Sequence, residues 1–326
     1  MDIRIISAED VRELLPMTKT IEAMRDAFAQ LAYNKVDVPL RTITEFDSPE
    51  LKMFYKPCYS TETNKAGIKL LTQTKGGVDN VPTIQGVNIL IDAKTGCFLA
   101  IVDGTYLTAL RTGAASGLAT DLLSREDAKI AAIFGAGAQG RTQLEAVCSV
   151  RKIECAYIFD INKNAVDKYI AEMQPYLNGT QLLHGKDLCQ LKEADVICTA
   201  TGATKPLFSR TDIKEGVHIN AVGSYKPHMQ EIDEQIMKDG YVYVDQRSAC
   251  LTETGDFIKP IGKGLFDEKH IVAELGELIA VRSYGRQSEQ AITLFKSVGI
   301  AVQDLVATHV VYQNALEQNK GMIVKI

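Results

Sequence analysis

The chain has 326 residues, of which 46% are hydrophobic, and its formal net charge is −5. This length and hydrophobic content predict two domains. The 36 lysines and arginines are scattered, so the sequence lacks the basic stripe that would bind nucleic acid or an anionic membrane surface. We therefore expect small molecules and other copies of the chain as partners.

The N-terminus and the cysteines indicate where the protein functions. The segment "MDIRIISAEDVRELL" carries charge throughout and lacks the apolar core of a signal peptide, and no stretch approaches about 18 uninterrupted apolar residues. We expect a cytoplasmic protein without a membrane span. The seven cysteines are widely spaced and form no C-x-x-C motif, which favours buried free thiols over disulfides or zinc. The five histidines show no ligand spacing, so we expect no metal site.

The first part of the chain predicts two helices followed by β-strands. Ser7 stands three residues before Asp10, a pattern typical of a capped helix start. The second predicted helix carries an apolar stripe formed by Ile21, Met24, Phe28 and Leu31. Short β-type runs follow, namely "LRTITEF", "KMFYK", "AGIKLLTQ", "GVNILID" and "FLAIVDG". The segment "AKTGC" between the last two predicts a hairpin.

From about residue 129 the pattern changes to strands that alternate with helices. The predicted strands are "KIAAIFG", "ECAYIFD", "QLLHG", "DVICTAT", "GVHINAVG" and "GYVYVD". Continuous apolar strands of this kind predict a parallel sheet covered on both faces. The last periodic segment, roughly 298–318, predicts a helix with a stripe formed by Leu305, Val306, His309, Val310 and Leu316. We expect this helix to pack on the first domain.

The predicted fold class is therefore α/β, with a Rossmann-like doubly wound parallel sheet and a smaller α+β domain. The smaller domain is discontinuous and comprises residues 1–118 and 302–326. The Rossmann-like domain comprises residues 119–301.

A glycine-rich turn predicts a dinucleotide-binding site in the second domain. Gly135, Gly137 and Gly140 stand in G-x-G-x-x-G register after a strand and before the helix "RTQLEAV". Asp160 ends the next strand, 20 residues after Gly140, where a carboxylate would bind the adenosine ribose. In the alternative interpretation the glycines only pack the helix on the strand. Asp160 favours NAD over NADP, and the nearby Lys163 leaves NADP open.

A later strand ends in Thr199, Ala200 and Thr201, on the same carboxyl edge of the predicted sheet. This edge is where cofactor contacts occur in doubly wound folds. An ordinary β-branched strand end explains each of the three residues equally well.

Three cations of the first domain have no obvious acid among their sequence neighbours. Arg41 comes after "VDVP", Lys69 lies inside the apolar strand "AGIKLL", and Arg111 lies in "LTALRTGAAS". A cation in an apolar strand needs a partner. An anionic substrate is one such partner, because Arg offers a fork to a carboxylate and Lys offers a point charge and a proton. Composition alone favours the alternative, in which each is an edge or surface cation or belongs to a structural ion pair.

Across nearly its whole length the chain resembles the ornithine cyclodeaminase/μ-crystallin family. The motifs that carry the resemblance are "LRTGAASGLAT", "GAGAQGRTQLEA", "INAVG", "AELGELI", "GRQS" and "SVGIAVQD". The resemblance implies a homodimer, in which the first domain with the C-terminal segment provides the subunit interface and part of the substrate site. It also implies that the Rossmann-like domain holds the dinucleotide.

The resemblance implies specific site residues as well. Arg41, Lys69 and Arg111 match the cations that bind the substrate carboxylate, and Val298 matches a substrate contact. The candidate catalytic residues are Lys69 and Tyr225. The candidate cofactor-binding residues are Thr83, Arg111, Thr112, Gly135, Gly137, Ala138, Gln139, Asp160, Thr199, Ala200, Thr201, Val222, Gly223, Ser224 and Ser297.

The sequence departs from the cyclodeaminases in "AVGSYKP". These enzymes carry an aspartate that serves the amine chemistry at the position of Tyr225, and Met229 replaces their downstream lysine. The segment "LKMFYKP" also lacks the acid that cyclodeaminases carry there. Tyrosine is a poor general base at neutral pH, whereas cyclodeamination needs several proton transfers.

Reduction of a preformed cyclic imine demands less, because the substrate can arrive protonated. The leading hypothesis is therefore an NAD(P)H-dependent reductase of Δ1-pyrroline-2-carboxylate or Δ1-piperideine-2-carboxylate that forms the L-amino acid by hydride transfer. Three alternatives stay open: ornithine cyclodeaminase, an open-chain amino-acid dehydrogenase or imine reductase, and a non-catalytic binding protein like μ-crystallin.

Overall fold

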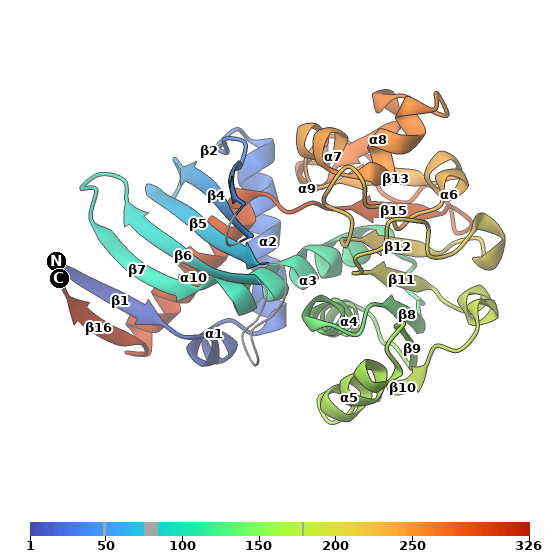
Figure 1. Cartoon of the computed structure of the whole chain (residues 1–326), viewed down its shortest axis with the longest axis horizontal. Coiled ribbons are helices and arrows are strands. Elements are labelled where there is room, and N and C mark those ends of the chain that lie inside the picture. The colour runs from blue at the N-terminus through green and yellow to red at the C-terminus, as the bar shows by residue number, and fades with distance from the viewer. Residues whose placement is uncertain (48–49, 75–83, 178) are drawn as a thin grey trace. The chain divides into compact units, whose positions relative to one another are not determined.

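The computed structural model describes residues 1–47, 50–74, 84–177 and 179–326 (Figure 1). The chain forms two compact units, one of Met1–Arg111 with Ile300–Ile326 and the other of Thr112–Gly299. The long helix α3 (Gly104–Leu123) contributes residues to both units. Among the described residues, no helix combines the length and the apolar character needed to cross a membrane.

The first unit is built on a mixed sheet whose strands run in the order β16-β1-β7-β6-β5-β4-β2, with β3 paired to β4. Its strands are β1 (Asp2–Ile6), β2 (Val36–Asp37), β3 (Thr42–Phe46), β4 (Leu51–Ser60), β5 (Lys65–Thr74), β6 (Ile84–Asp92), β7 (Phe98–Asp103) and β16 (Met322–Lys325). Strands β4 to β7 pair antiparallel, and β6 and β7 form the predicted hairpin. The terminal strands β1 and β16, which the sequence patterns did not indicate, pair with each other.

One face of this sheet is covered by helices. The helices of the unit are α1 (Ala8–Leu14), α2 (Met17–Ala32) and α10 (Ala301–Glu317). Helix α10 packs on α2 and on strands β4, β5 and β6 (Figure 1), which confirms the predicted packing of the C-terminal helix. Gly67 permits this approach, because a Cβ at that position would lie 2.9 Å from Cδ1 of Leu305. The predicted stripe is partly wrong, since Leu316 is 44% exposed and Val311 and Ala315 are buried instead.

The predicted start of α1 is confirmed. Ser7 caps the helix, and its side chain and backbone N–H form a reciprocal capping box with Asp10. This arrangement satisfies backbone N–H groups that a helix start otherwise leaves unpaired.

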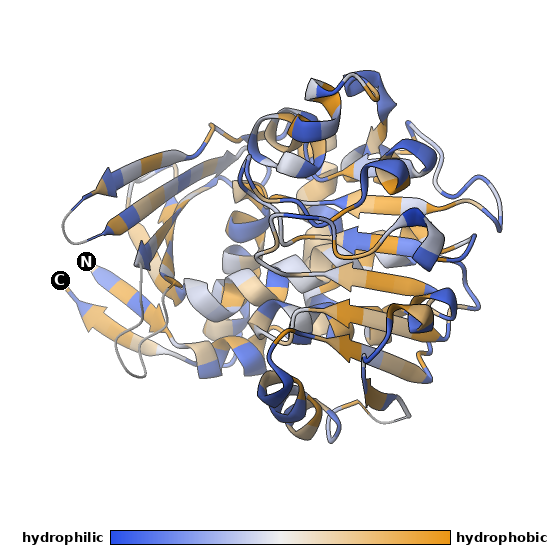
Figure 2. Cartoon of the chain, turned by 45° about the vertical axis from the view of Figure 1, so that its right-hand side comes forward, coloured by the Kyte–Doolittle hydropathy of each residue, from blue (hydrophilic) through white to orange (hydrophobic). Residues whose placement is uncertain are grey.

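The second unit contains a sheet of eight strands that are all parallel, in the order β10-β9-β8-β11-β12-β15-β13-β14. Its strands are β8 (Ile130–Phe134), β9 (Cys155–Phe159), β10 (Gln181–His184), β11 (Val196–Thr199), β12 (His218–Ala221), β13 (Tyr241–Val244), β14 (Ile271–Glu274) and β15 (Thr293–Lys296). Strands β11 and β12 are fully buried, and β8 is buried except at its first residue, Ile130. Figure 2 shows mainly hydrophobic colour along the middle of this sheet. The doubly wound α/β class predicted from the sequence is confirmed.

The helices of this unit flank the sheet (Figure 1). They are α4 (Ala138–Val150), α5 (Lys163–Met173), α6 (Glu234–Asp239), α7 (Arg247–Glu253), α8 (Gly255–Gly262) and α9 (Leu275–Ile279), with short 3-10 segments η1 (Leu188–Lys192), η2 (Arg210–Asp212) and η3 (Glu268–His270). Strand β8 lies between β9 and β11, so the direction of winding reverses there. In open α/β sheets, ligands bind in the crevice at the carboxyl ends of the strands beside such a reversal.

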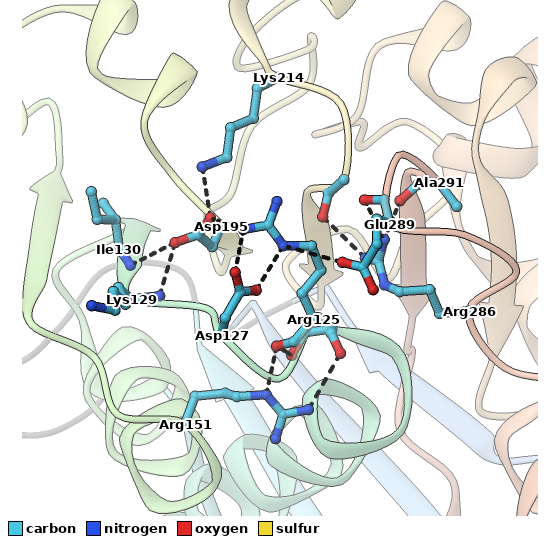
Figure 3. Close-up of polar contacts among 12 residues, drawn as sticks. Arg125, Asp127, Lys129, Ile130, Arg151, Asp195, Lys214, Arg286, Glu289 and Ala291 are labelled. Atoms are coloured by element: carbon cyan, nitrogen blue, oxygen red, sulfur yellow. Dashed lines mark hydrogen bonds and ion pairs between the residues drawn. The ribbon is translucent and has the colours of Figure 1, made fainter.

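The opposite, amino-terminal edge of the same sheet is held by a structural polar network (Figure 3). The Asp195 carboxylate accepts hydrogen bonds from the backbone N–H groups of Lys129 and Ile130, at 2.8 and 3.0 Å, and from Lys214 Nζ at 2.6 Å. The guanidinium of Arg286, from the "GRQS" motif, donates to the carbonyl oxygens of Ala291, Gly216 and Leu123, the last residue of α3. This part of the family motif therefore serves the fold.

The network predicts a stability effect at Asp195. Burial raises the pKa of this carboxyl, but the Lys214 ammonium and the two backbone N–H groups outweigh burial, so the net pKa lies below 3.8. Asp195→Asn should therefore lower the free energy of unfolding by about 1–3 kcal/mol at pH 7 in urea titrations. The difference between the proteins should shrink as pH falls below about 4, because the depressed pKa contributes stability only while the carboxylate is ionised.

Asp127→Asn is the matched control, because this neighbouring carboxylate is 69% exposed and pairs with Arg125. Its free energy of unfolding should stay within about 0.5 kcal/mol of the wild-type value. Equal losses in the two variants would contradict the role given to Asp195.

Candidate functional site

The glycine-rich turn after β8 has a different physical task for each of its glycines. Gly135 has φ +105°, a backbone conformation that side-chain-bearing residues rarely adopt. A Cβ at Gly140 would overlap the carbonyl oxygen of Gly135, so this glycine permits close packing of α4 on the turn. Gly137 caps the start of α4, and a Cβ there would meet open space. The open side at Gly137 and the free N–H groups of the helix start together fit a phosphate.

Asp160 follows β9 and supports the same turn. Its carboxylate accepts hydrogen bonds from the backbone N–H groups of Ala136 and Asn162, each at 2.8 Å. Each carboxylate oxygen can accept a second hydrogen bond, so Asp160 keeps acceptor capacity for a ribose hydroxyl. The next residues along the helix start, Ala138 and Gln139, also lie on this edge, and the buried Oε1 of Gln139 has no hydrogen-bond partner among the described residues.

The loops after β11 and β12 are joined by one buried carboxylate, that of Glu231. It accepts hydrogen bonds from the Thr199 hydroxyl, from the N–H and hydroxyl of Thr201, and from the N–H groups of Gly223 and Ser224, at 2.7 to 3.1 Å. Residues that the sequence predicts to contact a cofactor, among them Thr201, Gly223 and Ser224, therefore also donate hydrogen bonds to Glu231. Their contribution to a dinucleotide site would be to hold the two loops in place.

Glu231 belongs to a fully buried chain of charges. The Asp256 carboxylate accepts a hydrogen bond from the Glu231 N–H at 2.8 Å, and its other oxygen lies 2.9 Å from Lys296 Nζ. Burial raises the pKa of Glu231, an effect that the Lys296 ammonium opposes and the Asp256 carboxylate reinforces. These three side chains connect the loops after β11 and β12 to α8 and to the end of β15.

Two further strand ends carry candidate residues. The Asp245 carboxylate, after β13, accepts hydrogen bonds from the Ser297 hydroxyl at 2.7 Å and from the Val298 N–H at 3.0 Å. Tyr225, in the loop after β12, is half-buried, and Lys226 Nζ lies 5.1 Å from the centre of its ring. All of these positions follow the carboxyl ends of parallel strands, so they lie along one edge of the sheet.

In the first unit, two of the three predicted cations meet at one carboxylate that the sequence did not single out. Lys69 Nζ lies 2.8 Å from Asp304 Oδ1, and Arg111 Nε lies 3.0 Å from the same oxygen. All three residues are at most 3% exposed. Arg111 also donates to the Gln303 side chain at 2.8 Å. One negative charge therefore faces two positive charges in a desolvated cluster.

Electrostatics in this cluster shift several ionisations. Burial lowers the pKa of Lys69 to about 8, although Asp304 raises it. Burial raises the pKa of Asp304, but Arg111 and Lys69 outweigh burial and bring it to about 2. The third predicted cation, Arg41, is half-buried just before β3, and its charge contributes to lowering the pKa of Lys69.

A second lysine of the cluster, Lys56, is 8% exposed and lies directly opposite Lys69 in the pairing of β4 with β5. Asn88 lies opposite Lys69 on the other side, in β6, and is 3% exposed. Cross-strand partners project from the same face of a sheet, so the three side chains form a polar row beneath α10.

The predicted site residues therefore fall into two groups. Arg41, Lys69 and Arg111 belong to the first unit. Thr112 is the buried first residue of the second unit, and Thr83 lies outside the described residues. The remaining candidates follow the strand ends of the second unit and are Gly135, Gly137, Ala138, Gln139, Asp160, Thr199, Ala200, Thr201, Val222, Gly223, Ser224, Tyr225, Ser297 and Val298.

Sequence reasoning missed the carboxylates that organise both groups, although two signals were present. Asp304 is a charged residue in the mainly apolar first half of the C-terminal helix, and Asp245 ends the apolar strand "GYVYVD". Lys56 satisfies the same criterion that singled out Lys69, a cation within a strand buried on one face. No local signal marks Glu231, because its partners come from two loops that meet only in the folded protein.

Comparison with known proteins identifies the family. The family model described as ornithine cyclodeaminase/mu-crystallin matches residues 1–319. The chain belongs to the ornithine cyclodeaminase/mu-crystallin family. This membership confirms the resemblance inferred from the sequence motifs.

Relatives within the ornithine cyclodeaminase/mu-crystallin family match over nearly their full lengths. A Δ1-pyrroline-2-carboxylate reductase of Bacillus cereus is 35% identical over 319 residues, which cover 97% of this chain and 98% of that enzyme. The structure of Thermococcus litoralis Δ1-pyrroline-2-carboxylate reductase in complex with NADH and L-proline has a TM-score of 0.93 and 38% identity, and covers 98% of this chain and 99% of its own. An archaeal alanine dehydrogenase dimer with bound NAD also has a TM-score of 0.93, with 31% identity and complete coverage of both chains.

The cation cluster predicts a large stability effect at Asp304. Asp304→Asn leaves Lys69 and Arg111 buried beside a neutral amide, so the free energy of unfolding should fall by about 3–5 kcal/mol at pH 7. Because the pKa of Asp304 is lowered to about 2, its contribution is complete above about pH 4 and is lost as pH falls toward 2. Denaturant unfolding at pH 7 and at pH 3 measures both effects.

Glu22→Gln serves as the control, because Glu22 forms an exposed ion pair with Lys19 on α2. It should leave unfolding unchanged within error. An Asp304→Asn protein as stable as the wild type at pH 7 would contradict the interpretation of the cluster.

Proposed function

We propose that this protein is an NAD(P)H-dependent reductase of a small cyclic α-imino acid, Δ1-pyrroline-2-carboxylate or Δ1-piperideine-2-carboxylate, and forms the L-amino acid. The observation that carries the proposal is the charge imbalance at Asp304. One carboxylate balances one of the two buried cations, and the carboxylate of a substrate would balance the other. The similarity to reductases that bear this name supports the choice of substrate.

Separate residues of this protein would bind the substrate and transfer the proton. Arg41 and Arg111 would bind the substrate carboxylate, with Val298 as a further substrate contact. Lys69 has a pKa of about 8, so its ammonium is populated at neutral pH and can give a proton to the substrate nitrogen. A bound reduced nicotinamide dinucleotide supplies the hydride for the imine carbon.

The dinucleotide fits the carboxyl edge of the parallel sheet. Gly135 and Gly137 would leave room for the pyrophosphate at the start of α4, and Asp160 would bind the adenosine ribose. The loops held by Glu231 and Asp245 would border the nicotinamide. The NAD or NADH in related structures supports this assignment.

The loop after β12 supports reduction over cyclodeamination. Tyr225 occupies the position at which cyclodeaminases carry an aspartate, so no carboxylate stands there. The neighbouring carboxylates of Glu231 and Asp256 are fully buried and already accept hydrogen bonds from the protein. They cannot replace an accessible base without breaking those bonds. Tyr225 would line the pocket or donate a hydrogen bond.

An assay panel tests the proposal. The purified protein should oxidise NADH with either cyclic imine and yield proline or pipecolate. Absence of turnover with both imines would refute it. Ammonia release from ornithine would indicate a cyclodeaminase, and NADH oxidation with pyruvate and ammonia would indicate the activity named for the archaeal relative. Binding of the dinucleotide without any turnover would indicate a binding protein.

Lys69→Met tests the role given to the buried lysine. It should lower kcat with the cyclic imine by about 100-fold or more while the Kd for NADH, measured by fluorescence quenching, stays unchanged. Lys65→Met, on the same strand but paired with Asp92, should retain wild-type kcat. A variant at Lys69 with near-wild-type kcat would contradict the proton-donor role.

Asp160→Ser tests the cofactor preference. The carboxylate at this position repels a 2′-phosphate, so its removal should shift the ratio of kcat/KM for NADH over NADPH toward NADPH by about tenfold or more. Asp167→Ser, on the exposed face of α5, is the matched control and should leave the ratio unchanged. An unchanged ratio in Asp160→Ser would remove the ribose role of Asp160.

A homodimer is part of the proposal. On the face of the first sheet opposite α10, apolar side chains remain partly exposed, among them Ile68, Leu70, Val87, Ile89 and Ile101. Partly exposed apolar rows of this kind are typical of subunit interfaces. The dimeric archaeal relative supports a second copy of the chain as the partner. A cytoplasmic location stays a prediction from the sequence.

A further inference from the structure

The polar row beneath α10 contains more polar and charged side chains than binding of a carboxylate requires. Lys56, Lys69 and Asn88 are direct cross-strand neighbours on β4, β5 and β6. Neighbouring strands lie about 4.8 Å apart, so adjacent members of the row can interact directly or through one water molecule. The same helix that brings Asp304 to Lys69 covers the row.

A small cavity lies within this row. Its polar lining comes from Lys56, Lys69, Asn88, Asp304 and Thr308. Its volume is about 10 Å³, close to the smallest space that accommodates one water molecule. A buried water needs two to four polar partners, and this lining provides them.

The side-chain amide of Asn88, which lines the cavity, has unpaired hydrogen-bonding atoms within the described part of the chain. Its side chain is 3% exposed, and among the described residues neither Nδ2 nor Oδ1 has a hydrogen-bond partner. An amide left unpaired in this way costs about 1–3 kcal/mol, so an occupant that both donates and accepts is favoured. Water is such an occupant and fits the volume.

Burial makes both lysines of the row hold their protons less tightly than exposed lysines do. Burial, followed by the charges of Lys69 and Arg41, lowers the pKa of Lys56 well below 10.5, whereas Lys69 keeps a pKa of about 8 with the help of Asp304. Asp304, whose carboxylate lies 2.8 Å from Lys69 Nζ, favours return of a proton to a neutral Lys69. Once Lys69 is neutral, its repulsion of a charged Lys56 disappears, which favours uptake of a proton by Lys56.

We propose that one ordered water occupies this cavity and that Lys56 and Asn88, acting through it, return to Lys69 the proton that Lys69 gives to the substrate nitrogen. The inference rests on the proposed reductase function. In each turnover an N–H bond of Lys69 breaks as an N–H bond forms on the substrate. Lys56 then takes a proton from solvent and gives it to the water, and the water gives one to Lys69, so protons balance without any redox change at these residues.

Lys56 and Asn88 are positioning residues under this proposal, because they act through Lys69. Lys56→Met keeps the side-chain stem but removes the amine, and Asn88→Leu fills the cavity with an apolar group. In stopped-flow reduction of the cyclic imine, both variants should complete the first turnover at the wild-type rate, because Lys69 already carries its proton. The subsequent steady-state rate should fall by about 10- to 100-fold. This loss is no larger than the one expected for Lys69→Met, which removes the direct proton donor.

Three controls separate a relay from a structural role. Asn88→Ser retains a polar group and should restore most of the steady-state rate. Lys65→Met, on the same sheet and paired with Asp92, should match the wild type in both phases. The solvent deuterium isotope effect on the steady-state rate should rise in Lys56→Met, because proton return becomes rate-limiting.

Defined outcomes overturn the inference. Equal slowing of the first and later turnovers in Lys56→Met and Asn88→Leu would indicate a structural role only, and wild-type behaviour of both variants would exclude a relay. If either variant fails to fold, titration of ε-¹³C-labelled lysines in the wild-type protein by NMR decides, and a Lys56 signal that titrates near 10.5 overturns the inference. The titration needs no turnover, so it tests the relay separately from the proposed reductase activity.

Discussion

The first unit depends on one buried ion cluster, in which Asp304 of the C-terminal helix balances Lys69 of β5 and Arg111 of α3. These groups are removed from water, so each cation costs several kcal/mol unless an acid lies beside it. The acid comes from 235 residues further along the chain than Lys69. The C-terminal helix is therefore required in the first unit for electrostatic reasons as well as for its apolar packing.

The second unit follows the same principle with the signs reversed. Here buried carboxylates accept hydrogen bonds from loops at the carboxyl edge of the sheet. The donors to Glu231 lie at the ends of β11 and β12, and those to Asp245 follow β15. The loops are arranged by the protein's own hydrogen bonds before any cofactor binds. A site prepared in this way loses less conformational entropy on binding than a flexible one.

The chemistry that the second unit permits depends on which of its carboxylates already accept hydrogen bonds within the fold. In the second unit, the buried carboxylates of Glu231 and Asp256 already accept hydrogen bonds within the fold, so neither can act as a base without breaking those bonds. This arrangement favours reduction of an imino acid over chemistry that needs an accessible base at this strand end. In the first unit, the proposed relay through the adjacent buried lysines Lys56 and Lys69 would supply protons for repeated turnover.

The sequence by itself determined the features that depend on near neighbours: the capped first helix, the alternation of strands and helices, the turn at Gly135 and Gly137, and the family through its ordered motifs. Only the tertiary structure decided which charges meet. The register of β4, β5 and β6 placed Lys56, Lys69 and Asn88 in one row, and α10 brought Asp304 to it. Partners so far apart leave no local pattern, because their pairing arises from strand register and helix packing.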